Sequence, residues 1–194
     1  MFVIYALPIG LLLGLVLGGR LSGLATLRLR YAMLAVAGFL TQVILFSAPV
    51  ADRIGNLGPP IYVASTALVF AAVLANVRIR GMALVVVGAA CNLAAILANG
   101  GYMPASPDAA AAVGRETATS YSNVAVIASP ALEPLTDVIV LPEWLPFSNI
   151  ISIGDLLIGA GIAVVIAAAM RSARRDGADA GDGSSPVLGG NSPI

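Results

Sequence analysis

The chain has 194 residues, of which 59% are hydrophobic and only 10% are charged, and its mean hydropathy is +0.96. Soluble domains carry roughly 45–50% apolar and about 25% charged residues, and a domain of this length cannot bury so large an apolar excess. Ten arginines balance ten acids, and histidine is absent, which excludes Ser-His-Asp and Cys-His catalysis and histidine-ligated metal or haem sites. The composition therefore indicates an integral membrane protein.

Five segments are long and apolar enough to be membrane-spanning helices, which need roughly 17–25 mostly apolar residues. In chain order they are residues 2–18, 31–46, 61–77, 82–98 and 153–170. The first has no basic residue before its apolar run, so we interpret it as an uncleaved anchor and not as a signal peptide. The expected fold class is all-α: an integral membrane bundle of about five transmembrane helices over residues 1–175, with one long outer loop.

The arginines predict the orientation of this bundle. Eight of the ten fall on alternating connections, and only two fall on the others. The eight are Arg20, Arg28, Arg30, Arg78, Arg80, Arg171, Arg174 and Arg175; the two are Arg53 and Arg115. The positive-inside rule then places the N-terminus outside and the C-terminus in the cytoplasm. A composition rich in Ala, Gly and Arg suggests a bacterial protein, and thus the inner membrane.

Small residues and the tail have simple interpretations. Gly10, Gly14 and Gly18 form a stripe at four-residue spacing, which allows close helix packing, either within the bundle or in a homodimer. The single Cys91 lies in an apolar run and is interpreted as a small buried hydrophobic residue. Residues 176–194 are rich in Gly, Ser, Asp and Pro, so they are expected to form a disordered cytoplasmic tail.

The long connection at residues 99–148 is the most informative part of the sequence, because loops of this length are usually functional or disordered. Short β-branched runs at residues 124–127 and 138–141 predict strands or an interfacial segment. Trp144 and Phe147 precede the last helix, where aromatic side chains favour the headgroup level. We expect this loop to fold back over the membrane surface as a small cap.

Polar residues at the two ends of this loop are the candidate site. Asn99, Gly100 and Gly101 follow a helix, as a C-cap does, but the Asn99 amide is also suited to hold a substrate carbonyl. Asn149 is a second candidate for orienting substrate. Further along, Ser152 and Asp155 have the spacing of a capping box.

Two carboxylates in this region are candidate catalytic residues. Asp155 is the only carboxylate within a proposed span, and an intramembrane ionisable group suggests a functional site. Asp137 lies among apolar residues, where it is either a solvated loop carboxylate or a partner of Asp155. Because two adjacent carboxylates cannot both ionise cheaply, one would hold a proton while the other activates water.

The stretch from Asn99 to Pro104 and the stretch from Ser152 to Asp155 resemble an uncharacterised family of small bacterial multi-pass membrane proteins. That resemblance implies about five spans and no known activity. A local resemblance to signal peptidase II, an aspartic membrane protease, is carried by the segment 136–139 and by Asn149 through Asp155. It implies a catalytic dyad of Asp137 and Asp155, although the Gly-Asn-x-x-Asp-Arg signature of that family is missing.

Three functions fit these observations. A binding or assembly protein would use the outer loop to recognise a lipid, a peptide or a membrane-protein partner, with Gln42, Asn76 and Asn92 joining the helices. An aspartic membrane hydrolase would use the Asp137/Asp155 dyad. A transporter fits less well, because the spans carry almost no charge and five helices make poor inverted repeats. No motif for a cofactor, a metal or nucleic acid is present, so the expected partners are the lipid bilayer and a membrane protein or a second copy of the chain.

Overall fold

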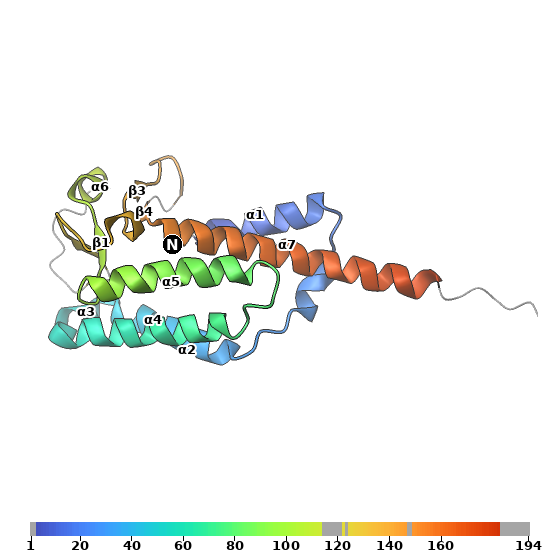
Figure 1. The fold of residues 1–194 in the computed structure, drawn as a ribbon, viewed down its shortest axis with the longest axis horizontal. Coiled ribbons are helices and arrows are strands. Elements are labelled where there is room, and N and C mark those ends of the chain that lie inside the picture. Colours follow the sequence, from blue (N-terminus) through green and yellow to red (C-terminus); the bar gives the residue numbers. More distant parts are fainter. Residues whose placement is uncertain (1–2, 114–121, 123, 147–148, 183–194) are drawn as a thin grey trace, which may run out of the picture.

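The computed structural model describes residues 3–113, 122, 124–146 and 149–182, and the fold is mostly helical. Five long helices run along one axis (Figure 1). They are α1 (Val3–Val16), α2 (Ala32–Leu45), α4 (Gly58–Leu74), α5 (Met82–Ala98) and α7 (Ile153–Asp182). Each overlaps one of the five segments that the hydropathy pattern predicts to be helical.

The helices pack in the order α2, α4, α5, α7 and α1, so α7 contacts a helix on each of two sides. Short helices join them at both ends of the bundle: η1 (Leu21–Thr26) follows α1, while α3 (Ala48–Ile54) and η2 (Gly55–Leu57) connect α2 to α4. These three elements are not anticipated by the sequence analysis, because they are too short to show a hydrophobic period of their own.

Helix α7 extends further than the sequence analysis predicted. We predicted disorder from residue 176, but α7 continues through Asp182, so seven residues of the predicted tail are helical. Residues 176–182 contain two glycines and three aspartates, which are weak helix formers, so the physical reason for the extension is the long preceding helix, which supplies the nucleus. Residues 183–194 of the predicted tail lie outside the described residues.

The connection between α5 and α7 folds as a small cap over one end of the bundle, and we use "the cap" for its described residues, 99–113, 122, 124–146 and 149–152. Strand β1 (Met103–Ala105) pairs in parallel with β2 (Val124–Val126), and β3 (Ile139–Val140) pairs antiparallel with β4 (Ile150–Ile151). The cap also contains α6 (Pro107–Ala112) and η3 (Glu133–Leu135). Strands form where the β-branched runs predicted them, so the all-α expectation holds for the bundle but not for the cap.

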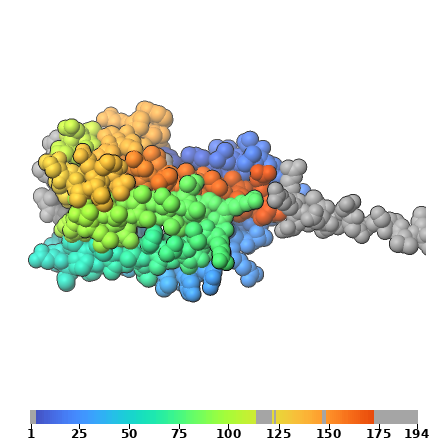
Figure 2. Space-filling model, in the orientation of Figure 1, coloured from blue at the N-terminus to red at the C-terminus, as the bar shows by residue number. Residues whose placement is uncertain are grey.

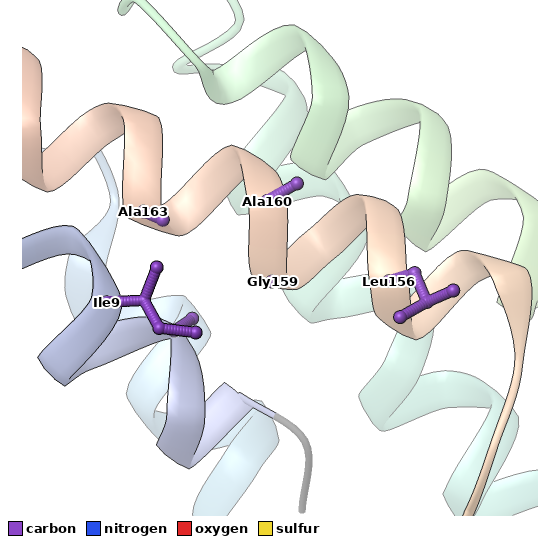
Figure 3. A pocket seen from close by; sticks show the side chains of 6 residues that line it. Ile9, Leu156, Gly159, Ala160 and Ala163 are labelled. Carbon is purple, nitrogen blue, oxygen red and sulfur yellow. The ribbon is translucent and has the colours of Figure 1, made fainter. Parts of the chain in front are cut away.

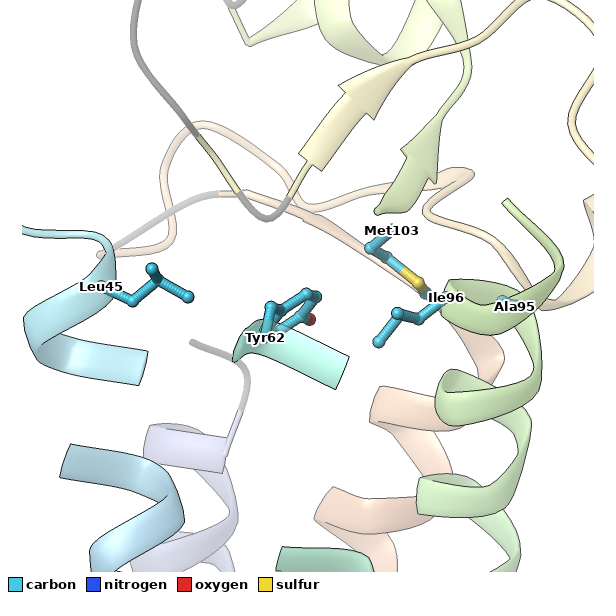
Figure 4. Close-up of a cluster of buried hydrophobic side chains, with 5 residues drawn as sticks. All are labelled: Leu45, Tyr62, Ala95, Ile96 and Met103. Atoms are coloured by element: carbon cyan, nitrogen blue, oxygen red, sulfur yellow. The ribbon is translucent and has the colours of Figure 1, made fainter. Parts of the chain in front are cut away.

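Buried side chains join the cap to the bundle. Figure 4 shows a cluster in which α2, α4, α5 and β1 meet; its members are Leu45, Tyr62, Ala95, Ile96 and Met103. A second cluster lies inside the cap and consists of Ala105, Ala109, Ala110 and Ile150. The cap is therefore a packed layer continuous with the helices, as the space-filling view also shows (Figure 2).

Helix α7 approaches its two neighbours at backbone distance. A Cβ atom built on Gly88 of α5 would lie 2.4 Å from the Gly154 carbonyl oxygen of α7. On the other side, a Cβ on Gly10 of α1 would lie 2.9 Å from the Cα of Ala163, and one on Gly14 would overlap the Met170 sulfur. Gly10 and Gly14 thus serve packing within the bundle, which is the first of the two interpretations of the glycine stripe.

Two helical stretches among the described residues are long and apolar enough to cross a membrane: Ala48–Leu74, with 27 residues, in which α3, η2 and α4 follow one another without a break, and Ile153–Ser172, with 20 residues, in α7. Three shorter apolar helices accompany them, namely Ile4–Val16, Ala32–Leu45 and Met82–Ala98. Only 22% and 39% of the apolar windows of the two long helices are buried, so neither is enclosed in the way that the core helix of a soluble protein is.

The close contact between α5 and α7 predicts that a larger side chain at position 88 destabilises the fold. The variant Gly88→Leu should lower the free energy of unfolding by about 1–3 kcal/mol, because its side chain would overlap the backbone of α7. Denaturation of the detergent-solubilised protein would measure this. The control is Val87→Leu, since Val87 on the same helix is 51% exposed and should tolerate the change. Equal stability of the two variants would contradict the close contact.

Candidate functional site

Asp155 lies in the first turn of α7 and takes part in a closed hydrogen-bond network. Its backbone N–H donates to the Ser152 hydroxyl oxygen at 3.0 Å, and the Ser152 N–H donates to Asp155 Oδ2 at 3.3 Å. This reciprocal pair is the predicted capping box. In addition, the Asn92 amide of α5 donates to Asp155 Oδ1 at 2.9 Å and its oxygen accepts from the Ser152 hydroxyl at 2.9 Å.

The network therefore joins two helices as well as capping one of them. Ser152 is fully buried, and Asn92 and Asp155 are half-buried. A Cβ on Gly154 would lie 1.8 Å from the Asn92 side-chain oxygen, so glycine at this position is what lets the amide reach both partners. Both carboxylate oxygens of Asp155 accept a hydrogen bond from within the chain, which suits a charged group that must leave water.

Asn99 has two structural tasks at the end of α5. Its amide nitrogen donates to the Ala95 carbonyl at 2.8 Å and to the Ala131 carbonyl at 2.9 Å, and its side-chain oxygen accepts from the Ala131 N–H at 2.9 Å. The first bond caps the end of α5. The other two fix Ala131, in a distant part of the cap, to this helix end. Gly100 and Gly101 have φ values of +70° and +89°, as the C-cap prediction requires.

Asp137 lies inside the cap and is 6% exposed. Its backbone is held against β1: the Asp137 N–H donates to the Pro104 carbonyl at 2.9 Å, and the Ser106 N–H donates to the Asp137 carbonyl at 3.3 Å. Pro104 and Ala105 belong to β1, and Ser106 follows it. Asp137 therefore extends the small parallel sheet by one bridge, to Ala105. It is therefore a buried cap residue and not the solvated loop carboxylate that was one of our two interpretations.

Asn149 directly precedes β4. Its side-chain oxygen accepts from the N–H of Ile150, the next residue, at 2.9 Å, and its carbonyl accepts from the Leu141 N–H at 2.9 Å. The amide thus closes a local turn at the entry to the last strand.

The structure gathers all the predicted site residues at the cap end of the bundle, although they come from separate segments. Asn99 ends α5, Asp155 begins α7, and the pairing of Ile139 with Ile151 lays the Asp137 segment alongside the residues that lead into α7. Asn92 is the member that the sequence analysis assigned only to helix packing. The signal that could have identified Asn92 was its position about two helical turns before Asn99, the C-cap of α5.

An apolar groove of about 350 Å³ lies between α1 and α7, below the cap (Figure 3). Its lining residues are Ala6, Ile9, Leu156, Gly159, Ala160 and Ala163. None of these side chains can transfer a proton or bind a charged group, so the groove contributes no chemistry to the neighbouring Asp155. Among the described residues, no group of three or more His, Cys, Asp or Glu side chains is placed to hold a metal ion.

Comparison with known proteins identifies a family and no activity. A family model described as a family of unknown function, DUF5317, matches residues 26–167, which include α2, α4, α5, the cap and the first half of α7. Searches of curated proteins and of solved structures returned no match. The family match agrees with the resemblance to an uncharacterised family, and the local resemblance to signal peptidase II stays a prediction.

The hydrogen bond between Asn92 and Asp155 predicts energetic coupling between α5 and α7. In a double-mutant cycle with Asn92→Ala and Asp155→Ala, the loss of stability in the double variant should be smaller than the sum of the single losses by about 1 kcal/mol. Unfolding in detergent would measure it. Pairing Asn92→Ala with Asp52→Ala, which removes an exposed carboxylate at the same end, should give additive effects. Additivity in both cycles would refute the coupling.

Proposed function

This chain belongs to the DUF5317 family of unknown function, and we propose that it is a five-span membrane protein whose outer cap binds another membrane-associated molecule. In this proposal α1, α2, α4, α5 and α7 cross the inner membrane of a bacterium. The N-terminus and the cap face outward, and the end of α7 lies in the cytoplasm. The protein acts as a binding or assembly component.

The exposure of large apolar side chains on the helices supports the membrane part of the proposal. Val16, Met33, Leu12 and Phe39 are 81%, 76%, 62% and 62% exposed on α1 and α2. Contiguous apolar surface of this kind is unfavourable in water and natural in lipid. The 20-residue apolar stretch of α7 is about 30 Å long, which equals the hydrocarbon thickness of a typical bilayer. The shorter helices lie beside it along the same axis (Figure 1).

The distribution of charge supports the orientation. The three arginine-bearing connections meet at one end of the bundle: the Arg20 N–H donates to the Met170 carbonyl at 2.8 Å, and the Arg30 N–H donates to the Asn76 side chain at 2.8 Å. The opposite end carries the cap and six described carboxylates, which belong to Asp52, Asp108, Glu133, Asp137, Glu143 and Asp155. The gathering of arginines at one end is what the positive-inside rule expects of a cytoplasmic face, and the carboxylates add little to this argument.

The observation that carries the binding function is the apolar surface of the cap. Although the cap has its own buried core, it leaves Trp144 80% exposed, and Leu132 and Val126 are 48% and 46% exposed. Exposed aromatic and aliphatic side chains are typical anchors for a partner. The hydrogen bond from the Tyr5 hydroxyl to the Pro146 carbonyl ties this part of the cap to α1.

An aspartic hydrolase is the less favoured alternative. The proximity of the Asp137 segment to the start of α7 speaks for a dyad of Asp137 and Asp155. Against it, Asp155 already accepts hydrogen bonds at both carboxylate oxygens, and the Asn99 amide, proposed to hold a substrate carbonyl, is bonded to Ala95 and Ala131. Because Asp155 and Asn99 use their hydrogen bonds to hold the fold together, they are less suited to bind and activate a substrate. Binding at the cap surface is therefore the better-supported function.

Cysteine labelling tests the orientation, because Cys91 is the only cysteine and one substitution removes it. In the Cys91→Ala background, Ser129→Cys should react with a membrane-impermeant maleimide in intact cells, whereas Ser22→Cys should react only after the membrane is opened. Both serines are exposed in the fold, so a difference in labelling reports the side of the membrane and not the burial of the side chain. The reverse pattern would invert the orientation, and labelling of both positions in intact cells would contradict the five-span arrangement.

The binding function predicts that Trp144→Ala weakens a complex without unfolding the protein. A stoichiometric complex isolated with the wild type in mild detergent should lose at least tenfold in affinity, which corresponds to about 1.4 kcal/mol for an aromatic anchor. The control is Phe39→Ala, which removes an exposed aromatic ring from α2 instead of the cap. A wild-type chain that stays alone under these conditions, or equal losses in both variants, would contradict binding at the cap.

A further inference from the structure

The end of the bundle opposite the cap carries a dense group of arginines that the proposed binding function does not use. We define the arginine end as residues 17–31, 75–81 and 170–172. It contains six exposed arginines: Arg20, Arg28, Arg30, Arg78, Arg80 and Arg171. The same residues contain no Asp or Glu, and the next acid along α7 is Asp176.

The structure holds these three segments together by backbone and side-chain hydrogen bonds. Asn76 is 6% exposed; its side-chain oxygen accepts from the Arg30 N–H at 2.8 Å and its amide nitrogen donates to the Arg30 carbonyl at 2.8 Å. On the other side, the Arg20 N–H donates to the Met170 carbonyl, and Gly23 of η1 packs on the backbone of Ala169. The arginines therefore project from a fixed platform.

Apolar side chains are interleaved with these arginines. Leu21 and Leu29 are 58% and 44% exposed, and each directly follows an arginine. Tyr31 is 57% exposed, and the Arg30 guanidinium lies 5.8 Å from the centre of its ring, as in a cation–π pair. Exposed leucines suit acyl chains, an exposed tyrosine favours the headgroup level, and guanidinium groups donate bidentate hydrogen bonds to phosphate.

We propose that the arginine end binds the phosphate groups of anionic phospholipids in the membrane leaflet that surrounds it. Charge complementarity carries the inference, because a cluster of four to eight basic residues at the cytoplasmic end of spanning helices attracts anionic lipid. A nucleic acid is a poorer occupant, since the leucines among the arginines would face water in such a complex. The inference rests on the proposed membrane arrangement and adds a ligand class at the end opposite the cap.

The test uses the full chain purified in a neutral detergent. Native mass spectrometry would count retained phosphatidylglycerol and phosphatidylcholine with identical acyl chains. The wild type should prefer phosphatidylglycerol, and the preference should weaken with salt because the attraction is screened. The variant R78Q/R80Q should reduce the preference by roughly five- to thirty-fold, given the attraction of each arginine to an anionic surface.

The matched control is R53Q/R115Q, which removes two arginines that do not belong to the arginine end and should keep the wild-type preference. The variant R78K/R80K, which keeps the charge, should retain most of it, and thus separates charge from folding. Equal retention of both lipids by the wild type, or equal losses in R78Q/R80Q and R53Q/R115Q, would overturn the proposal. So would full competition by glycerol phosphate, because the site would then bind a soluble phosphate.

Failure of this proposal is distinguishable from failure of the proposed function. Lipid retention in detergent does not depend on which face of the membrane the arginines occupy, whereas the labelling of Ser22→Cys and Ser129→Cys does. A correct labelling pattern without a lipid preference would remove the lipid site alone, and a lipid preference with inverted labelling would remove the orientation alone.

Discussion

The close approach of α7 to its neighbours is the constraint on which the rest of the structure depends. In the membrane arrangement that we propose, apolar side chains gain little by contacting one another instead of acyl chains, so helices associate through small residues and interhelical hydrogen bonds. Here Gly88 and Gly154 bring the backbones of α5 and α7 together, and Gly10 allows α1 to approach from the other side. The network of Asn92, Ser152 and Asp155 then fastens the contact at the cap end. Since β4 leads directly into α7, the position of this helix also positions the cap.

The same polar residues, which are the candidate site, also hold the helices and the cap together. Asp155 caps α7 and accepts from α5, and Asn99 ends α5 and clamps Ala131. A buried polar group is stable only when its hydrogen bonds are made, and here the chain itself makes them. The surfaces that we propose for recognition are exposed: apolar side chains on the cap at one end, and guanidinium groups among leucines at the other. The molecule is thus polarised in charge and in surface chemistry along the axis of its helices.

Several local features were predictable because their signals are short-range. The helix of residues 82–98 was predicted with its observed bounds, the capping box of Ser152 and Asp155 formed as its spacing indicates, and Gly100 and Gly101 adopt the positive φ values of a helix end. Gln42 and Asn92 each make the interhelical hydrogen bond expected of polar residues in apolar helices, whereas Asn76 lies after the end of α4 and joins two connections through Arg30. Short elements such as α3 and η1 were missed, because a helix of six or seven residues spans too few turns to show a period.

The sequence by itself determined which segments are helices and how arginine alternates between connections, since both follow from hydrophobic length and charge along the chain. It also determined that the chemistry of histidine is absent. Only the tertiary structure decided that Asn92 bonds a carboxylate 63 positions away, that β1 pairs with β2 in parallel across 18 intervening residues, and that Asp137 is buried. Such partners carry no local signature, because their energy arises only when packing removes both groups from water. The physical role of each polar residue was therefore set by what the fold placed opposite it.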